Sequence, residues 1–295
     1  METAEDKNKR LYKLIYDAFN NEIAIQRHLM EKYLKVQGFV PFKILQFSSL
    51  FLKPSFFYSL FLRIFCGCCF LLHLFLGVLL FILYPLRLIE VGKRTKNLII
   101  TSNPYKVIVR EAITQLKLQP TDFIDASISN LLFLVRKTHL INFLFFFFGF
   151  TKYLIRNAKN PFLFLLQYTD LLRLYLVSAY IIDNPNIAVI TEDHYQRFPF
   201  IVSNLRCSNF IIVQHGYIDD SIHFPSKFGR IDNLFIRDIQ FLECFDNYYD
   251  VISYKILVRN MTSFFSKMDY KDSCFLASSS PHIDSEIKFV EYLKK

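Results

Sequence analysis

Glycine is scarce in this chain, which has seven glycines among 295 residues and no tryptophan. P-loops and dinucleotide fingerprints need several glycines at fixed spacing, because the backbone there turns tightly and approaches a phosphate closely. Neither motif occurs in the sequence. The scarcity of glycine therefore excludes these two classes of nucleotide-binding loop.

The sequence also lacks a recognisable metal site. None of its six cysteines has zinc-site spacing, and Cys66, Cys68 and Cys69 lie inside an apolar run, where thiols behave as small hydrophobic groups. No Ser–His–Asp motif stands out. We expect no metal, no cofactor and a reducing, cytoplasmic compartment. The charged, polar N-terminus predicts no signal peptide.

The chain carries a formal net charge of +9 and is 53% hydrophobic. A composition this apolar excludes a disordered protein. Basic proteins bind nucleic acid or anionic membranes, or act on phosphorylated substrates. The lysines and arginines form no stripe with regularly spaced aromatic residues, and several flank apolar segments. We therefore favour a membrane as the partner and expect no nucleic acid.

Residues 1–95 are expected to form a helical, membrane-associated region. Residues 1–36 have helical periodicity, which predicts one or two amphipathic helices that pack on the protein or lie on a membrane. Residues 64–86 carry no formal charge and are long enough to cross a bilayer. A spanning or deeply embedded helix is the preferred interpretation, with a buried helix or a hairpin in one leaflet as alternatives.

After residue 95, short apolar runs alternate with helix-length segments. This rhythm predicts an α/β domain with a Rossmann-like parallel sheet over residues 96–272. Strands are expected at residues 97–102, 123–125, 187–190, 209–213, 232–237 and 252–258. Helices are expected at residues 105–116, 195–205 and 238–248.

Two further apolar segments lie inside this domain. Residues 131–150 include four consecutive phenylalanines, which give no helical stripe, and the run is short for a bilayer span. A buried helix is therefore preferred over a membrane-touching one. Residues 161–182 contain Asp170 and Arg173 on one helix face, which favours a long amphipathic helix over a span.

Polar clusters end two of the expected strands. Glu192 and Asp193 end the first, and Gln214, His215 and Gly216 end the second. Ligands of parallel sheets bind beyond the carboxyl ends of the strands. A histidine there can act as a general base, a carboxylate can orient it or serve as the base, and a glycine lets a ligand approach the backbone. The alternatives are a histidine that bonds loop carbonyls and carboxylates that cap the next helix.

Three more residues are candidates for contacts to a phosphate. Arg197 lies one turn into the helix after Asp193, where it can meet a phosphate or pair with Glu192 or Asp193, although a plain surface ion pair is the simpler interpretation of this residue alone. Ser279 and Ser280 lie in a loop between a strand and a helix, where backbone N–H groups suit a phosphate. Residues 273–295 are expected to begin a second α/β domain, which is truncated after this one unit.

In chain order these segments resemble a known family. The set consists of the strand IAVITED, the helix with Arg197, the strand FIIV, the tripeptide QHG and the later unit CFLASSSPHIDSEIKFVEYLKK. It resembles GT-B glycosyltransferases of bacterial surface-polysaccharide synthesis and is similar to the related CDP-glycerol glycerophosphotransferases. The resemblance covers residues 95–295 and rests on pattern, without a long diagnostic motif.

The resemblance implies an enzyme of capsule or lipopolysaccharide synthesis at the cytoplasmic face of the plasma membrane. Such an enzyme moves a sugar, or glycerophosphate, from a nucleotide-activated donor to a glycan or lipid-linked acceptor. His215 would be the base or a substrate contact in the cleft between two domains. The sequence departs from the family because the donor-binding domain is reduced to one βα unit, so the chain would be inactive alone. The alternative is a non-catalytic, membrane-anchored scaffold or partner-binding protein.

Overall fold

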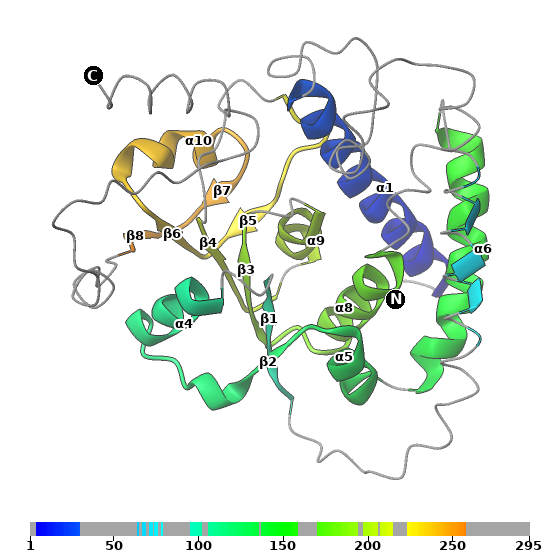
Figure 1. Ribbon diagram of the computed structural model, residues 1–295, viewed down its shortest axis with the longest axis horizontal. Coiled ribbons are helices and arrows are strands. Elements are labelled where there is room, and N and C mark those ends of the chain that lie inside the picture. The colour runs from blue at the N-terminus through cyan, green and yellow to red at the C-terminus, as the bar shows by residue number, and fades with distance from the viewer. Residues whose placement is uncertain are drawn as a thin grey trace, which may run out of the picture.

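The computed structural model gives the fold of the central part of the chain (Figure 1). It describes residues 4–29, 95–101, 106–135, 137–158, 170–193, 197–205, 207–214 and 223–257, with residues 64, 67, 68, 71, 72, 74, 75 and 78. This part is an α/β fold built on a parallel sheet of six strands.

The strands of this sheet lie in the order β2-β1-β3-β4-β6-β8, and each neighbouring pair is parallel. Their bounds are β1 Asn97–Ile100, β2 Phe123–Asp125, β3 Ala188–Glu192, β4 Asn209–Val213, β6 Asn233–Ile236 and β8 Tyr254–Ile256. The six predicted strands are confirmed. A separate parallel pair, β5 Arg230–Ile231 and β7 Asp250–Val251, was not predicted, because two residues are too few to show alternation.

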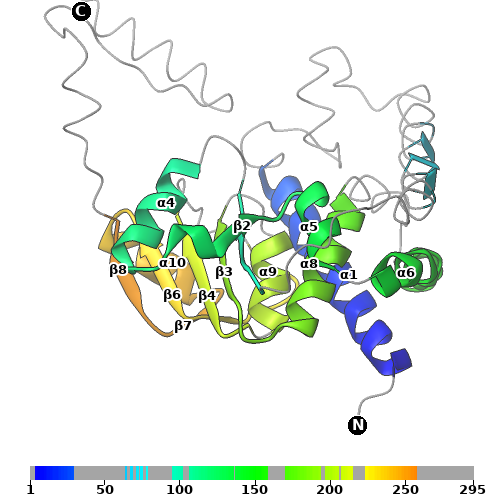
Figure 2. The same ribbon diagram turned by 90° about the horizontal axis from the view of Figure 1, so that it is seen from below.

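Helices cover both faces of the sheet (Figures 1 and 2). The helices are α1 Ala4–Leu29, α4 Lys106–Gln115, α5 Ile128–Leu134, α6 Lys137–Asn157, α8 Leu171–Asp183, α9 Arg197–Leu205 and α10 Leu242–Asp246. Two short 3₁₀ turns are η4 Pro120–Asp122 and η6 Ile239–Phe241. The predicted helices 105–116, 195–205 and 238–248 are confirmed as α4, α9 and η6 with α10.

Alternation along the strands divides the apolar side chains between two cores. Val189 and Ile212 pack in the larger core with α1, α5, α6, α8 and α9, whereas Ile190 and Ile211 pack with α4. Successive strand residues point to opposite faces, so a continuous apolar strand can fill both cores. The apolar runs of the sequence therefore indicate a sheet that is buried on both sides.

The strand order changes direction between β1 and β3. The connection from β1 to β2 carries α4 on one face, while the later connections carry their helices on the other face. Right-handed crossovers require this change of face when the direction reverses. The helices that follow β1 and β3, α4 and α9, therefore lie on opposite faces of the sheet, and the position between these two strands is a switch point, where parallel sheets commonly bind ligands.

The helix α8 lies in the middle of the larger core. Ten of its thirteen residues are buried, from Leu171 to Ile181 with the exception of Arg173. The segment was expected to be an amphipathic helix, and the helix is confirmed over its described part. It is buried on nearly all sides, because α1, α5, α6 and α9 surround it. Arg173 donates from Nε to the carbonyl of Ala126 at 2.7 Å.

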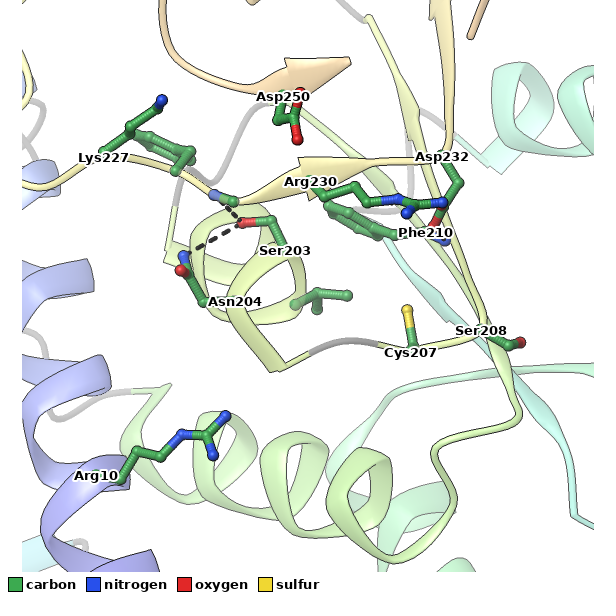
Figure 3. Close-up of a pocket in the computed structure, with 13 residues that line it drawn as sticks. Arg10, Ser203, Asn204, Cys207, Ser208, Phe210, Lys227, Arg230, Asp232 and Asp250 are labelled. Carbon is green, nitrogen blue, oxygen red and sulfur yellow. Dashed lines mark hydrogen bonds and ion pairs between the residues drawn. The ribbon is translucent and has the colours of Figure 1, made fainter. Parts of the chain in front are cut away.

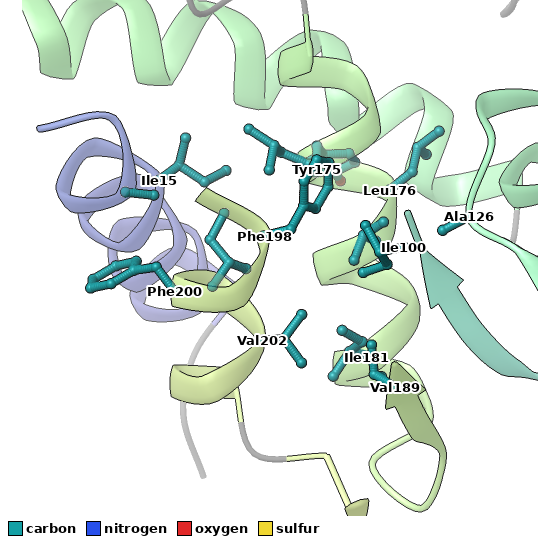
Figure 4. Packing of buried hydrophobic residues seen from close by; sticks show 14 of the residues in the cluster. Ile15, Ile100, Ala126, Tyr175, Leu176, Ile181, Val189, Phe198, Phe200 and Val202 are labelled. Atoms are coloured by element: carbon teal, nitrogen blue, oxygen red, sulfur yellow. The ribbon is translucent and has the colours of Figure 1, made fainter. Parts of the chain in front are cut away.

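Apolar side chains from α1, α8, α9 and the sheet meet in this core (Figure 4). The residues labelled there include Ile15, Tyr175, Leu176, Val189, Phe198 and Val202. Leu11, Ile15 and Phe19 of α1 are buried in it. Packing of the first predicted helix on the protein is therefore confirmed, and α1 shares a core with helices that lie beyond residue 95.

The expectation that the phenylalanine run has no helical stripe is wrong. Within α6, Phe143, Phe146, Phe147 and Phe150 are buried, and this i, i+3, i+4, i+7 spacing is one face of a helix. Phe146 lies 4.7 Å from Tyr175 of α8, measured between ring centroids. The run of four phenylalanines hides the stripe because its other two members lie on the outer face.

The domain divisions near residues 95 and 272 stay predictions. Residues 273–295 and most of 64–86 lie outside the described part, so a bilayer crossing by residues 64–86 is also untested. The residues described between Ile64 and Val78 are helical, and Leu74 packs against the larger core. Among the described helices, Thr138–Asn157 alone is long and apolar enough to cross a membrane by length and composition, a test that a core helix also passes.

Candidate functional site

A hydrogen bond joins the ends of β1 and β3 at the switch point. Oγ1 of Thr101, the residue after β1, donates to Oε2 of Glu192, the last residue of β3, at 2.7 Å. The strands are paired so that Ile100 lies beside Thr191, and the next residues along the chain, Thr101 and Glu192, therefore also lie side by side. Glu192 is 2% exposed. A hydroxyl that donates to a carboxylate makes one of the stronger neutral-to-charged hydrogen bonds, so the position of this carboxylate is well fixed.

Glu192 and Asp193 do not act as a pair, because consecutive residues lie on opposite faces of the sheet. Glu192 lies on the side of Ile190, which packs with α4. Asp193 is also buried and lies near Tyr249 on the other side. Burial raises the pKa of the Tyr249 phenol well above its usual value, and the negative charge of Asp193 raises this pKa further. Glu192 is thus the carboxylate at the switch point.

Gln214 connects the ends of β4 and β6. Its side chain is fully buried, and its Oε1 accepts a hydrogen bond from the backbone N–H of Arg237 at 2.9 Å. The backbone N–H of Gln214 donates to the backbone carbonyl of Phe235 at 2.8 Å. The geometry therefore gives Gln214 a part in positioning the chain that enters His215.

Four predicted site residues lie outside the described part of the chain, namely His215, Gly216, Ser279 and Ser280. Their proposed roles stay predictions. His215 directly follows Gln214 in the sequence, at the carboxyl end of β4, and β4 is the neighbour of β3. The chain therefore enters His215 from the strand next to the one that ends at Glu192.

Arg197 is buried at the start of α9 and pairs with carboxylates from two other parts of the fold. One guanidinium nitrogen lies 2.6 Å from Oε1 of Glu22 in α1, and another lies 3.0 Å from Oδ2 of Asp170, which precedes α8. The predicted partners were a phosphate, Glu192 or Asp193. The observed ion pairs give Arg197 a structural role that sequence spacing did not show, because Glu22 is distant in the chain.

Sequence reasoning missed Thr101 at the switch point and Glu111 in α4. Thr101 was treated only as part of a strand, although it follows β1 as Asp193 follows β3. Glu111 lies in the second turn of α4, and its Oε2 is buried without a hydrogen-bond partner among the described residues. Because an unpaired buried oxygen is costly, Glu111 is a further candidate for a ligand contact. Its sequence signal is a charge among apolar residues that face the sheet.

A pocket of about 1190 Å³ lies at the opposite edge of the sheet (Figure 3). Its walls come from the end of α9 and the starts of β4 and β5, including Ser203, Cys207 and Arg230. None of the predicted site residues lines it. Arg230 is paired with Asp232 at 2.6 Å, and the other oxygen of Asp232 accepts from the N–H of Phe210.

The chemistry of this pocket is limited by its thiol. Burial, and then the charge of Asp232, raise the pKa of Cys207 to about 12. The thiol therefore stays protonated near neutral pH and is a poor nucleophile. Among the described residues, no three His, Cys, Asp or Glu side chains are grouped as metal ligands. The carboxyl edge, with its fixed carboxylate, remains the better candidate for a substrate site.

Comparisons with known proteins identify no relative. No family model, no curated protein and no solved structure matches the chain. The function is therefore inferred from the fold and from the residues at the carboxyl edge of the sheet.

Proposed function

We propose that the sheet edge at the carboxyl ends of β1, β3 and β4 is the acceptor-side site of a GT-B-type transferase with a Rossmann-like domain. The observation that supports this proposal is the hydrogen bond from Thr101 to Glu192 at the switch point. It fixes a buried carboxylate on the strand next to the one that leads into His215. A carboxylate and a histidine at neighbouring strand ends are the groups that acceptor activation needs.

The proposed reaction is the transfer of a sugar, or of glycerophosphate, from a nucleotide-activated donor to a hydroxyl group. His215 takes the proton of the acceptor hydroxyl. The oxygen of that hydroxyl attacks the activated carbon or phosphorus of the donor, and the nucleotide of the donor leaves. Glu192 orients the acceptor or the imidazole and stabilises the imidazolium that forms. Because Glu192 is buried, its interaction with that positive charge is stronger than it would be in water.

The residues around Glu192 support the proposed site in different ways. Thr101 holds the carboxylate, and Gln214 holds the chain that enters His215. Asp193 lies near Tyr249 on the other face of the sheet. Arg197 joins helices through its ion pairs, so in this proposal its role is structural.

Matched substitutions in the full chain test the proposal. The assay measures nucleotide release from a panel of nucleotide sugars and CDP-glycerol, and calorimetry measures donor binding. We expect His215→Ala to lower turnover at least about a hundredfold, the scale of a lost general base. Glu192→Gln, which keeps the acceptor for Thr101 but removes the charge, should lower kcat more than it changes KM.

Exposed residues of the same types serve as controls. His223→Ala and Glu243→Gln should leave turnover unchanged, because both side chains are exposed and neither belongs to the proposed site. Turnover that survives His215→Ala would remove His215 from the mechanism. A chain that binds no donor in the panel would contradict the transferase proposal and favour the scaffold hypothesis.

A further inference from the structure

The helix α6 has two apolar faces, and one of them is open to solvent. The inner face packs on α1 and α8 through Phe143, Phe146 and Phe150. Phe145 on the outer face is 71% exposed, and Phe148 is 55% exposed. Figure 2 shows α6 at one margin of the molecule. The chain thus presents two large aromatic side chains to solvent, beside a core that is rich in aromatics.

These two residues belong to a continuous stripe, which we call the outer stripe. It consists of Ile141, Phe145, Phe148, Lys152 and Ile155, all of which are exposed. At about 100° per residue, the five positions lie within about 80° of one another around the helix. Exposed apolar residues that occur singly are ordinary, but a contiguous stripe on one helix indicates a binding surface.

A second group of exposed apolar side chains lies beside α6. The residues described between Ile64 and Val78 are helical, and Figures 1 and 2 both draw them next to α6. Among them, Leu71 and Phe75 are largely exposed, whereas Leu74 packs against the core. The apolar surface therefore extends beyond a single helix along this margin of the molecule.

The charges of α6 indicate what covers the outer stripe. The helix contains no aspartate or glutamate, while Lys152 lies within the stripe and Arg156 lies next to it, both exposed. Two copies of this face would bring four positive side chains together without an acidic residue of α6 to pair with them. Anionic lipid headgroups supply that pairing, and the chain as a whole has a net charge of +9.

We propose that the outer stripe of α6 docks on an anionic lipid bilayer. Phe145 and Phe148 insert at the level of the headgroups and upper acyl chains, and Lys152 extends its charged end to the lipid phosphates. The helix axis lies in the membrane plane, because the inner face of α6 is occupied by α1 and α8. This inference is independent of the transfer reaction proposed above, and it does not require residues 64–86 to cross the bilayer.

Tryptophan fluorescence tests the proposal directly, because the natural chain has no tryptophan. In the full chain, Phe148→Trp places a single reporter on the outer stripe. The matched control is Ile252→Trp, at an exposed position between β7 and β8, which Figure 1 draws on the opposite side from α6. The vesicles contain phosphatidylcholine with or without phosphatidylglycerol, and either ordinary or brominated acyl chains.

We expect the Phe148→Trp emission to shift to shorter wavelength with anionic vesicles and to be quenched by brominated chains. The Ile252→Trp emission should show neither effect. Removing one charge with Lys152→Gln should weaken binding to anionic vesicles about fivefold, whereas Lys255→Gln on β8 should change it little.

Two outcomes would overturn the proposal. The first is a chain that sediments with vesicles while the Phe148→Trp reporter stays unshifted and unquenched, since binding would then use another surface. The second is a lipid-free dimer in analytical ultracentrifugation that Phe145→Ser dissociates, because the occupant of the outer stripe would then be a second copy of the chain.

Discussion

Arg197 connects three parts of the fold through two ion pairs. Its guanidinium is fully buried between Glu22 of α1 and Asp170, which precedes α8. A buried ion pair gains little relative to apolar residues of the same shape, because both charges lose their hydration. Removing the arginine is different, since the carboxylate of Glu22, whose side chain is 13% exposed, then stays largely buried without its counter-charge. The position of α9 relative to α1 thus depends on one side chain.

We expect Arg197→Met to lower the free energy of unfolding by about 3–5 kcal/mol, the cost of breaking a buried ion pair. Urea unfolding followed by circular dichroism measures this change. The matched control is Arg230→Met, which removes an ion pair with Asp232 whose arginine side chain is 61% exposed, and which should cost less than about 1 kcal/mol. Unchanged stability with lost turnover in Arg197→Met would instead favour the phosphate contact that the sequence predicts.

At the scale of elements, the contact between α1 and α6 depends on a glycine. A Cβ added at Gly149 would lie 2.1 Å from Oη and 2.8 Å from Cζ of Tyr12. The Tyr12 ring has little room to move, because it contacts the rings of Phe146, Phe150 and Tyr153. A glycine inside a helix is normally unfavourable, so this one is explained by the close approach of α1.

We expect Gly149→Ala to lower the free energy of unfolding by about 1–3 kcal/mol, although alanine favours a helix over glycine. Urea unfolding of the variant beside the natural chain gives the change. Adding Tyr12→Phe removes the phenolic oxygen and should recover part of the loss. A Gly149→Ala chain that is more stable than the natural one would show that α1 and α6 pack less closely than described.

At the scale of the whole molecule, burial in the larger core changes the pKa of several side chains. Burial raises the pKa of Tyr175, Tyr249 and Cys207, and that of Cys207 reaches about 12. Each group therefore holds its proton more tightly in the folded chain than in the unfolded chain. This tighter proton binding stabilises the folded state. The stabilisation is fully present at pH values below the ordinary pKa values, which are about 8.5 for cysteine and 10 for tyrosine.

The free energy of unfolding should therefore fall as the pH rises above these ordinary values toward the raised pKa values of the folded chain. Urea unfolding at a series of alkaline pH values measures the decline. Tyr249→Phe removes one of the titrating groups and should make the decline less steep. Tyr254→Phe, at an exposed position on β8, should leave it unchanged. Equal slopes for both variants would contradict a contribution from Tyr249.

Much of the fold follows from local patterns in the sequence. Short apolar runs predict the six strands of the sheet, because a parallel sheet that is buried on both faces needs apolar residues at consecutive positions. Polar residues after β3 and β4 predict the edge at which the candidate site lies. The inner stripe of α6 was missed, because its flanking phenylalanines are equally apolar and a stripe is visible only against polar neighbours.

The sequence alone therefore determined the class of fold and the candidate edge, since both depend on periodicity and on where strands end. Only the tertiary structure decided which residues meet there. Thr101 and Glu192 come together because β1 pairs with β3, and Arg197 meets Glu22 because α1 packs on α9. Such contacts join residues that are far apart in the chain, so local propensity carries no signal for them. They depend on strand order and helix packing, which are determined only by the complete fold.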